Sequence, residues 1–344
     1  MIWIPTFFVK KKYFFDIIHE KMDNKDMKLA DIKKAEEFLS SILRPTPVFK
    51  SYISDKYNIF LKPENLQYTG SFKIRGAVNK ICNLTEEEKA KGVICCSAGN
   101  HAQGVALAAS NMGIKAIVCM PKSAPQVKIE STKKLGAEVV LVDGVYDDAY
   151  EKALELQEQY GYTFVHPFND EKVIEGQGTI GVEILRDLPN ADAILCAVGG
   201  GGLISGIACA AKQIKSDIKV YGVQAAGAPS MSASFANGYV TKLHKVKTFA
   251  DGIAVKEVGN ITLDYVKEYV DDILTVSDDQ ILDAIKLLMQ REKLISEGAG
   301  AAPLAAVLNN LVPNLTPDSN VVCVISGGNI DIDLLSKIVL QGLD

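Results

Sequence analysis

One lysine of this chain stands in apolar surroundings. Lys73 lies between Phe72 and Ile74, at the start of a run with helical apolar spacing. Burial disfavours an ammonium group, so the pKa of such a lysine falls and its neutral amine becomes available for Schiff-base chemistry. The segment SFKIRGA therefore points to a nucleophilic lysine, although taken alone it is also typical of a lysine on an ordinary surface.

A second segment, SAGNHAQG at residues 97–104, joins a predicted strand to a predicted helix. Ser97 and Asn100 can both cap this helix, and the N–H groups exposed at such a turn bind anions. The two side-chain amides and two glycines of the segment exceed what capping requires. Anion binding and an ordinary strand-to-helix turn both remain open at this point.

Four consecutive glycines, Gly199 to Gly202, precede Leu203 at another joint between strand and helix. Ordering glycine carries a high entropic cost, so the run is expected where the backbone approaches a ligand closely. The dinucleotide fingerprint is excluded because its sixth position falls on Ser205, and no Gly-Lys-Ser/Thr follows to make a nucleotide P-loop. N–H groups at a helix N-terminus suit a phosphate dianion, and we interpret the run as a phosphate cradle.

The fourth segment, SGGN, begins with Ser326 at the carboxyl end of a predicted strand. Ligands of open α/β sheets gather at such strand ends. The Ser326 hydroxyl is suited to a hydrogen bond with a ring nitrogen, and a tight turn is the alternative interpretation.

The four segments lie at the joints of an alternating pattern of strands and helices. The sequence predicts strands over 93–97, 115–120, 138–143, 193–198, 219–223 and 320–326, and helices over 101–112, 126–135, 172–187, 203–212, 278–293 and 299–309. Such close β-α-β spacing is typical of mostly parallel sheets flanked by helices. We predict an α/β fold with two lobes, a small one over 84–168 and a large one combining 27–83 with 169–344.

The composition excludes several classes of protein. The chain has 344 residues, of which 48% are apolar, and its 37 basic and 42 acidic side chains give a net charge of −5. A disordered chain is far less apolar, and a slightly acidic surface binds nucleic acid poorly. A membrane helix needs about 18 continuous apolar residues, which no stretch provides. Neither nucleic acid nor a membrane is expected as a partner.

The seven cysteines form an odd set without a Cys-x-x-Cys pair, and five of them lie in apolar, strand-like runs. This usage indicates reduced, buried thiols in a cytoplasmic protein. A zinc site is not expected, because only four histidines are present and none stands at ligand spacing to a cysteine.

Other features receive structural interpretations. Residues 1–26 are predicted to form a poorly ordered extension. Thr85 and Glu88 are predicted to form a capping box that starts a short solvated helix ending at Gly92. Structural or surface roles are assigned to three histidines, His19, His166 and His244.

In their order along the chain, SFKIRGA, SAGNHAQG, GGGGL and SGGN resemble the motifs of the serine/threonine dehydratase and serine racemase family. The resemblance runs from about Leu43 to the C-terminus. It implies a two-lobed fold of the tryptophan-synthase-β type (fold type II) with pyridoxal 5′-phosphate as cofactor. It further implies a homodimer or homotetramer, and in some short, catabolic members an AMP-type nucleotide effector.

The resemblance also implies roles for individual residues. Lys73 would bind the cofactor as a Schiff base with Phe72 packed beside it, and Ser326 would face the pyridine nitrogen. Glu297 is expected near the ring. Asn100 would bind the ring's 3′ oxygen. The phosphate would be held by Gly199, Gly200, Gly201, Gly202 and Leu203. The substrate carboxylate would be held by Ser97, Asn100 and His101.

Within the family, small departures favour elimination over racemisation. Serine racemases carry a proton-donating Ser before Gly-Asn-His, where this chain has Ala98. At the positions matching their divalent-cation site it has poor ligands for a hard cation, namely Gln224, Ala228 and Ser230, and no metal is expected. The resemblance therefore implies an L-threonine ammonia-lyase that also acts on L-serine. The alternatives are a serine racemase, a serine-preferring dehydratase and a nucleotide-binding regulator without catalysis.

Overall fold

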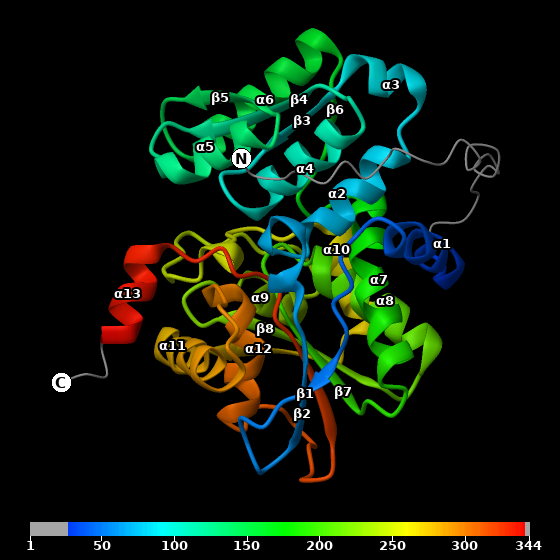
Figure 1. Ribbon diagram of the computed structural model, residues 1–344, viewed down its shortest axis with the longest axis vertical. Coiled ribbons are helices and arrows are strands. Elements are labelled where there is room, and N and C mark those ends of the chain that lie inside the picture. Colours follow the sequence, from blue (N-terminus) through cyan, green and yellow to red (C-terminus); the bar gives the residue numbers. More distant parts are fainter. Residues whose placement is uncertain (1–26, 341–344) are drawn as a thin grey trace.

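The computed structural model describes residues 27–340 and places their strands in two separate sheets (Figure 1). The larger sheet has the order β1-β2-β10-β7-β8-β9, in which all neighbours are parallel except β1 and β2. Its strands are β1 (Phe49–Lys50), β2 (Asn58–Lys62), β7 (Ala193–Ala197), β8 (Lys219–Ala225), β9 (Asp272–Val276) and β10 (Asn320–Val324).

Helices cover both faces of the larger sheet. Alternate residues of β7 separate into two cores, with Leu195 on one face and Ile194 and Cys196 on the other. The face of Leu195 packs against α11 (Asp278–Leu287) and α12 (Gly298–Leu308), whose Ala-rich sequence lets it lie wholly inside the core. The opposite face packs against α7 (Glu171–Asp187), α8 (Gly202–Ile214) and α10 (Asn260–Tyr269).

The smaller sheet is entirely parallel, in the order β5-β4-β3-β6. Its strands are β3 (Val93–Cys96), β4 (Ala116–Pro121), β5 (Glu138–Val142) and β6 (Thr163–Phe164). One face packs against α2 (Lys73–Cys82), α4 (Asn100–Asn111) and α5 (Gln126–Lys134), and α6 (Tyr146–Tyr160) covers the other. The remaining α-helices are α1 (Leu29–Ser40), α3 (Glu86–Lys91), α9 (Ser230–Asn237) and α13 (Ile332–Leu340).

Helix α2 lies between the two lobes. Its apolar residues, among them Ile74 and Ile81, belong to the core beside the smaller sheet, although their segment was assigned to the large lobe. On its other side α2 touches α7 so closely that a Cβ on Gly176 would lie 2.7 Å from the Cα of Gly76. Residues 27–83 thus contribute strands to the larger sheet and a helix to the core beside the smaller sheet, and the predicted lobe boundaries stay a prediction.

The predicted fold class is confirmed, and most predicted elements begin and end within two residues of those observed. The capping box is confirmed, because the Glu88 N–H donates to Thr85 Oγ1 and the Thr85 N–H donates to Glu88 Oε2. The helix predicted over 278–293 is wrong at its end. Regular helix stops at Leu287, a wide π-helical turn over Leu288–Glu292 follows, and Lys293 takes a left-handed φ of 61°.

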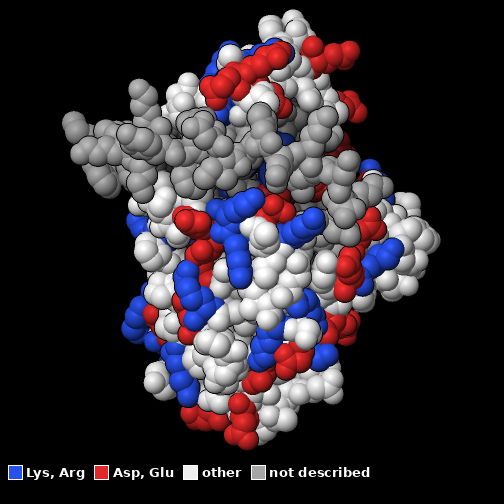
Figure 2. Space-filling model, turned by 90° about the vertical axis from the view of Figure 1, so that its right-hand side faces the viewer, with Lys and Arg blue, Asp and Glu red and all other residues white. Residues whose placement is uncertain are grey.

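All seven cysteines are free, and six of them are buried, as predicted. Within residues 27–340 no helix is long and apolar enough to cross a bilayer. Figure 2 shows basic and acidic side chains interspersed over one face of the molecule. The predicted N-terminal extension, with His19, lies outside the described residues.

Candidate active site

Lys73 is the first residue of α2, and its side chain is partly buried at the junction of the two lobes. Its Nζ donates a 2.7 Å hydrogen bond to the carbonyl oxygen of Pro167 and lies 5.2 Å from the centre of the Phe72 ring. Desolvation lowers the pKa of Lys73 to about 8, although the charge of Glu297 acts in the opposite direction. A large fraction of this amine is therefore neutral in slightly alkaline solution.

The Pro167 carbonyl belongs to a turn that a histidine holds in place. Nδ1 of His166 accepts hydrogen bonds from the N–H groups of Phe168 and Asn169, at 3.2 and 2.8 Å. Burial and the neighbouring Lys73 charge lower the pKa of His166 to about 4. The imidazole is therefore a neutral acceptor, and its structural assignment agrees with these contacts.

The glycine run lies against the same turn. A Cβ on Gly200 would lie 2.3 Å from the Phe168 ring, and one on Gly201 would lie 2.6 Å from Met231. Gly201 also has a φ of 101°, which residues other than glycine rarely adopt. Helix α8 begins here, and its first intrahelical bond runs from the Ser205 N–H to the Gly201 carbonyl. The four preceding N–H groups are thus left for an anion.

Asn100 is fixed from two sides. Its Nδ2 donates to Glu297 Oε1 at 2.8 Å, and its Oδ1 accepts from Asn329 Nδ2 at 2.7 Å. Asn329 also donates to the Thr69 carbonyl. Since Glu297 takes one of the two Nδ2 hydrogens, the amide of Asn100 has one further hydrogen to donate to a ligand.

Glu297 is a buried carboxyl group at this site. Its pKa is raised to about 7, mainly by desolvation, while the hydrogen bond from Asn100 acts to lower it. Its backbone N–H bonds the Gly327 carbonyl, and a Cβ on Gly327 would lie 2.5 Å from its Oε1. The glycine after Ser326 therefore leaves room for the carboxyl group.

Ser326 is 2% exposed and follows β10. Its carbonyl accepts the Phe72 N–H at 3.0 Å, and an isolated bridge pairs Ser71 with Gly327. The SGGN and SFKIRGA segments therefore lie side by side. With the contacts of Asn100 and Pro167, all four segments singled out in the sequence meet at one place.

The residues predicted to hold a carboxylate lie at the start of α4. Ser97 Oγ accepts the Gly99 N–H, and a Cβ on Gly99 would meet nothing within 4 Å, which marks open space at this turn. His101 is buried, and its Nε2 bonds the Val165 carbonyl at 2.8 Å. Its Nδ1 has no partner, and desolvation lowers its pKa to about 3. The neutral imidazole cannot supply a second donor, so His101 could reach an anion only through its backbone.

These features fit pyridoxal 5′-phosphate. Lys73 supplies an amine of lowered pKa, the start of α8 supplies N–H groups for a phosphate, and Asn100 supplies a donor for the ring oxygen. The open space at Gly99 directly precedes Asn100 in the chain. The residues present are therefore suited to the cofactor that the motifs imply.

The residues at the positions that match the cation site of racemases are buried, and their polar groups do not form a cation site. Gln224 is buried, donates to the Val198 carbonyl and accepts the Ser232 N–H, so its amide is already used. Ala228 and Ser230 are also buried. No cluster of three or more His, Cys, Asp or Glu suited to a metal occurs among residues 27–340.

Sequence reasoning missed several residues of this site. It named neither Pro167 and Phe168, which touch Lys73 and the glycine run, nor Asn329, which orients Asn100. Pro167 acts through a carbonyl group, which every residue carries, so no signal in the sequence marks it. Asn329 stood inside a recognised motif, and its amide among glycines was a usable signal.

Comparisons with known proteins show what the chain is similar to. A family model described as "Pyridoxal-phosphate dependent enzyme" matches residues 39–327. The L-threonine ammonia-lyase of Thermotoga maritima is 50% identical over 318 residues, which cover 92% of this chain and 79% of that protein. The processed form of threonine deaminase isoform 2 from Solanum lycopersicum aligns with a TM-score of 0.87 and 41% identity, over 92% of this chain and 88% of that one. Maize serine racemase aligns with a TM-score of 0.86 and 35% identity, over 92% and 98%.

Proposed function

The chain belongs to the family of pyridoxal-phosphate-dependent enzymes, and from this premise we propose that it is an L-threonine ammonia-lyase. It removes the β-hydroxyl group of L-threonine and yields 2-oxobutanoate and ammonia, and it converts L-serine to pyruvate in the same way. The observation that carries the proposal is the partly buried Lys73 amine of lowered pKa, which bonds the turn that packs against the glycine run before α8.

When bound, pyridoxal 5′-phosphate supplies an electron sink that stabilises negative charge at the substrate's α-carbon. Lys73 would hold the cofactor covalently, and Gly199–Leu203 would bind its phosphate. The Lys73 amine would also serve as the base that takes the proton from the substrate's α-carbon. Its lowered pKa leaves a useful neutral fraction near neutral pH.

Asn100 and Ser326 set the polarity of the ring's surroundings. Asn100, oriented by Glu297 and Asn329, would donate its remaining Nδ2 hydrogen to the ring oxygen. Ser326 is a neutral side chain and need not protonate the pyridine nitrogen, which favours prompt loss of the β-hydroxyl group over transamination. The start of α4, where Gly99 faces open space, binds the substrate carboxylate through N–H groups.

Ala98 favours elimination over racemisation. Racemisation needs a proton donor on the second face of the α-carbon, and the methyl group of Ala98 has no proton to give. The likeness to a serine racemase structure makes this the alternative to test. That alternative predicts D-serine as the main product from L-serine.

The test is steady-state turnover of purified protein with L-threonine and with L-serine. We expect 2-oxobutanoate from L-threonine and pyruvate from L-serine, each in the same molar amount as the ammonia released. We expect little D-serine from L-serine. A large D-serine fraction without dominant pyruvate would support the racemase. Purified protein that takes up no cofactor, judged by visible absorbance after pyridoxal 5′-phosphate is added, would support a nucleotide-binding regulator.

We further propose assembly as a homodimer or homotetramer, a cytoplasmic location and control by an AMP-type nucleotide. The family resemblance supports the assembly and the effector, and the free, mostly buried cysteines support the location. Light scattering of the purified protein tests the assembly, and turnover at limiting L-threonine with and without AMP tests the effector. A monomer would contradict the proposed assembly, and a turnover rate unchanged by AMP would contradict the proposed effector.

A further inference from the structure

Four buried charges lie behind the lysine-bearing helix. Arg75 is 1% exposed and stands two residues after Lys73 on α2. Glu64 follows β2, Glu183 lies on α7, and Lys62 ends β2. All four are less than a tenth exposed. The two positive and two negative charges balance, as burial requires.

Arg75 is the centre of this cluster, because its guanidinium bonds both carboxylates in paired fashion. Nε and Nη2 donate to Glu64 at 2.8 Å each, and Nη1 and Nη2 donate to Glu183 at 2.6 and 2.9 Å. Further bonds reach Thr46 and Thr179 at 3.1 Å. Two planar forks of this kind fix a guanidinium in orientation as well as in distance.

These bonds fix α2 along the axis of α7. Gly76 and Gly176 let the two backbones touch, and across the same contact Asn79 donates to the Lys172 carbonyl while Lys80 pairs with Asp170. Arg75 adds bonds that reach a third element, because it ties α2 to Glu183 on α7 and to Glu64 beside β2. The Lys73 Nζ must reach Pro167, which stands just before α7 begins, so its position depends on this register.

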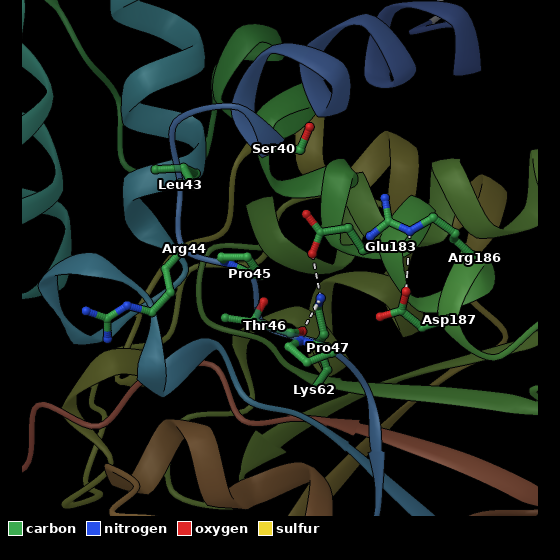
Figure 3. Close-up of a pocket in the computed structure, with 10 residues that line it drawn as sticks. All are labelled: Ser40, Leu43, Arg44, Pro45, Thr46, Pro47, Lys62, Glu183, Arg186 and Asp187. Atoms are coloured by element: carbon green, nitrogen blue, oxygen red, sulfur yellow. Dashed lines mark hydrogen bonds and ion pairs between the residues drawn. The ribbon is translucent and has the colours of Figure 1, made fainter. Parts of the chain in front are cut away.

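The cluster reaches the surface at a pocket lined by Thr46, Lys62 and Glu183 (Figure 3). Figure 3 shows the Lys62 amine pointing to Glu183 and Arg186 pointing to Asp187, while Arg44 turns away from the pocket. Arg44 is itself bonded to the Leu66 carbonyl. Every charged group lining the pocket thus has a partner, so the pocket does not call for a ligand.

We propose that Arg75 is a positioning residue for the reaction, which sets the Lys73 amine in place by locking α2 to Glu64 and Glu183. This inference rests on the proposed function, because it assumes that the Lys73 amine carries the chemistry. Arg75 itself touches neither Lys73 nor the glycine run in any contact described above.

A purely structural role makes a different prediction. Lys62 belongs to the same cluster and bonds Glu183 and the Thr46 carbonyl, but it does not contact α2. If the cluster only stabilises the protein, Arg75→Met and Lys62→Met should affect the active site alike. If Arg75 positions Lys73, only the Arg75 variant should disturb the lysine beyond its loss of stability.

The experiment measures how fast Lys73 of the cofactor-free protein forms its covalent adduct with added pyridoxal 5′-phosphate. Absorbance follows the rate across pH, and borohydride reduction with peptide mapping confirms the site. For Arg75→Met we expect a rate about tenfold lower and a shifted pH profile, and in the holoenzyme a kcat lower by about 10- to 100-fold with KM changed less than about threefold. Arg75→Lys should not rescue these values, because an ammonium cannot form both forks.

The controls decide between the roles. Arg186→Gln removes the two ion pairs that this exposed arginine of the same helix as Glu183 makes with Glu36 and Asp187, and it should leave adduct formation unchanged. Equal effects of Arg75→Met and Lys62→Met, or full rescue by Arg75→Lys, would overturn the proposal. Should both Arg75 variants fail to fold, Glu183→Gln decides, with slowed adduct formation expected and a wild-type rate overturning it. Normal adduct formation at Lys73 in wild type without threonine turnover would refute the proposed function alone.

Discussion

At the scale of single residues, the chemistry depends on an amine that is partly withdrawn from water. Lys73 keeps a partner, the Pro167 carbonyl, that accepts a hydrogen bond without supplying a negative charge. A carboxylate at that place would have raised the pKa of the lysine, whereas burial lowers it to about 8.

The first prediction concerns this amine. Lys73→Ala should reduce threonine turnover to background while the far-ultraviolet circular dichroism spectrum stays native, because the variant lacks the amine that would hold the cofactor. Lys91→Ala is the control, since Lys91 ends the neighbouring helix α3 and its pair with Glu87 is exposed. Retained turnover in Lys73→Ala would remove the lysine from the mechanism.

The second prediction concerns the pH dependence of stability. The pKa of Glu297 is raised from 4.5 to about 7, so the folded state binds more protons than the unfolded state between these values. Its contribution is therefore fully present below pH 4.5 and is lost as pH rises through 7. Relative to Glu297→Gln, the cofactor-free wild type should lose about 3 kcal/mol over this range in urea unfolding. Parallel stability curves would contradict the buried carboxyl assignment.

Residue types explain what could be foreseen at this scale. Three site residues stand out in the sequence because each is a polar residue directly beside an apolar strand or helix, namely Lys73, Asn100 and Ser326. Arg75 did not stand out, since an arginine at a helical position is usually solvated, and only the arrangement in space shows that Glu64 and Glu183 surround it. Long-range charge pairing of this kind leaves no periodic signal.

At the scale of elements, the turn before α8 shows how closely backbone geometry and packing are linked. We predict that Gly201→Ala weakens cofactor binding at least tenfold, because the new Cβ would lie 2.6 Å from Met231 and 2.7 Å from Thr262 at a φ of 101°. Absorbance titration with pyridoxal 5′-phosphate measures the affinity.

Gly238→Ala is the control for backbone strain alone. Gly238 also has a positive φ, of 76°, but a Cβ there would meet nothing within 4 Å. It should cost about 1 kcal/mol of stability and leave cofactor affinity unchanged. Equal loss of affinity in both variants would show that the close packing at Gly201 is irrelevant.

The strength of local patterns decided which elements were predictable. The fully buried strands β3, β4, β7 and β10 were found because their apolar runs are bounded by turn residues. Helix α10 was missed because the segment 225–271 mixes irregular turns with short elements, and β9 was missed because it is an edge strand with exposed positions. The end of α11 was misjudged since its apolar spacing continues into the wide turn.

At the scale of the whole molecule, contacts between the lobes converge on the site. Asn100 of the small lobe bonds Glu297 of the large lobe, and Lys128 on α5 pairs with Asp251 at 2.8 Å. Asp251 precedes Gly252, whose Cβ position lies 3.3 Å from Glu297 Oε1. The ion pair therefore joins the lobes directly beside a buried carboxyl group.

The fourth prediction tests this ion pair. Lys128→Gln and Asp251→Asn should each speed hydrogen exchange at residues 251–253, and the double variant should show a coupling of about 1 kcal/mol or less, because the pair is partly exposed. Salt should weaken the coupling. Lys122→Gln breaks an exposed pair with Asp143 inside the small lobe. It should change neither the rate of hydrogen exchange at residues 251–253 nor the coupling between Lys128 and Asp251.

The backbone of the reactive lysine is held between glycines of facing helices. A Cβ on Gly104 of α4 would lie 3.2 Å from the Lys73 carbonyl carbon, and one on Gly176 of α7 would lie 2.7 Å from the Arg75 carbonyl oxygen and from the Gly76 Cα. Helix α2 thus lies in close backbone contact with both neighbouring helices. A relative displacement of the two lobes would therefore move the backbone of Lys73, so the residue that carries the chemistry also lies where the lobes contact each other.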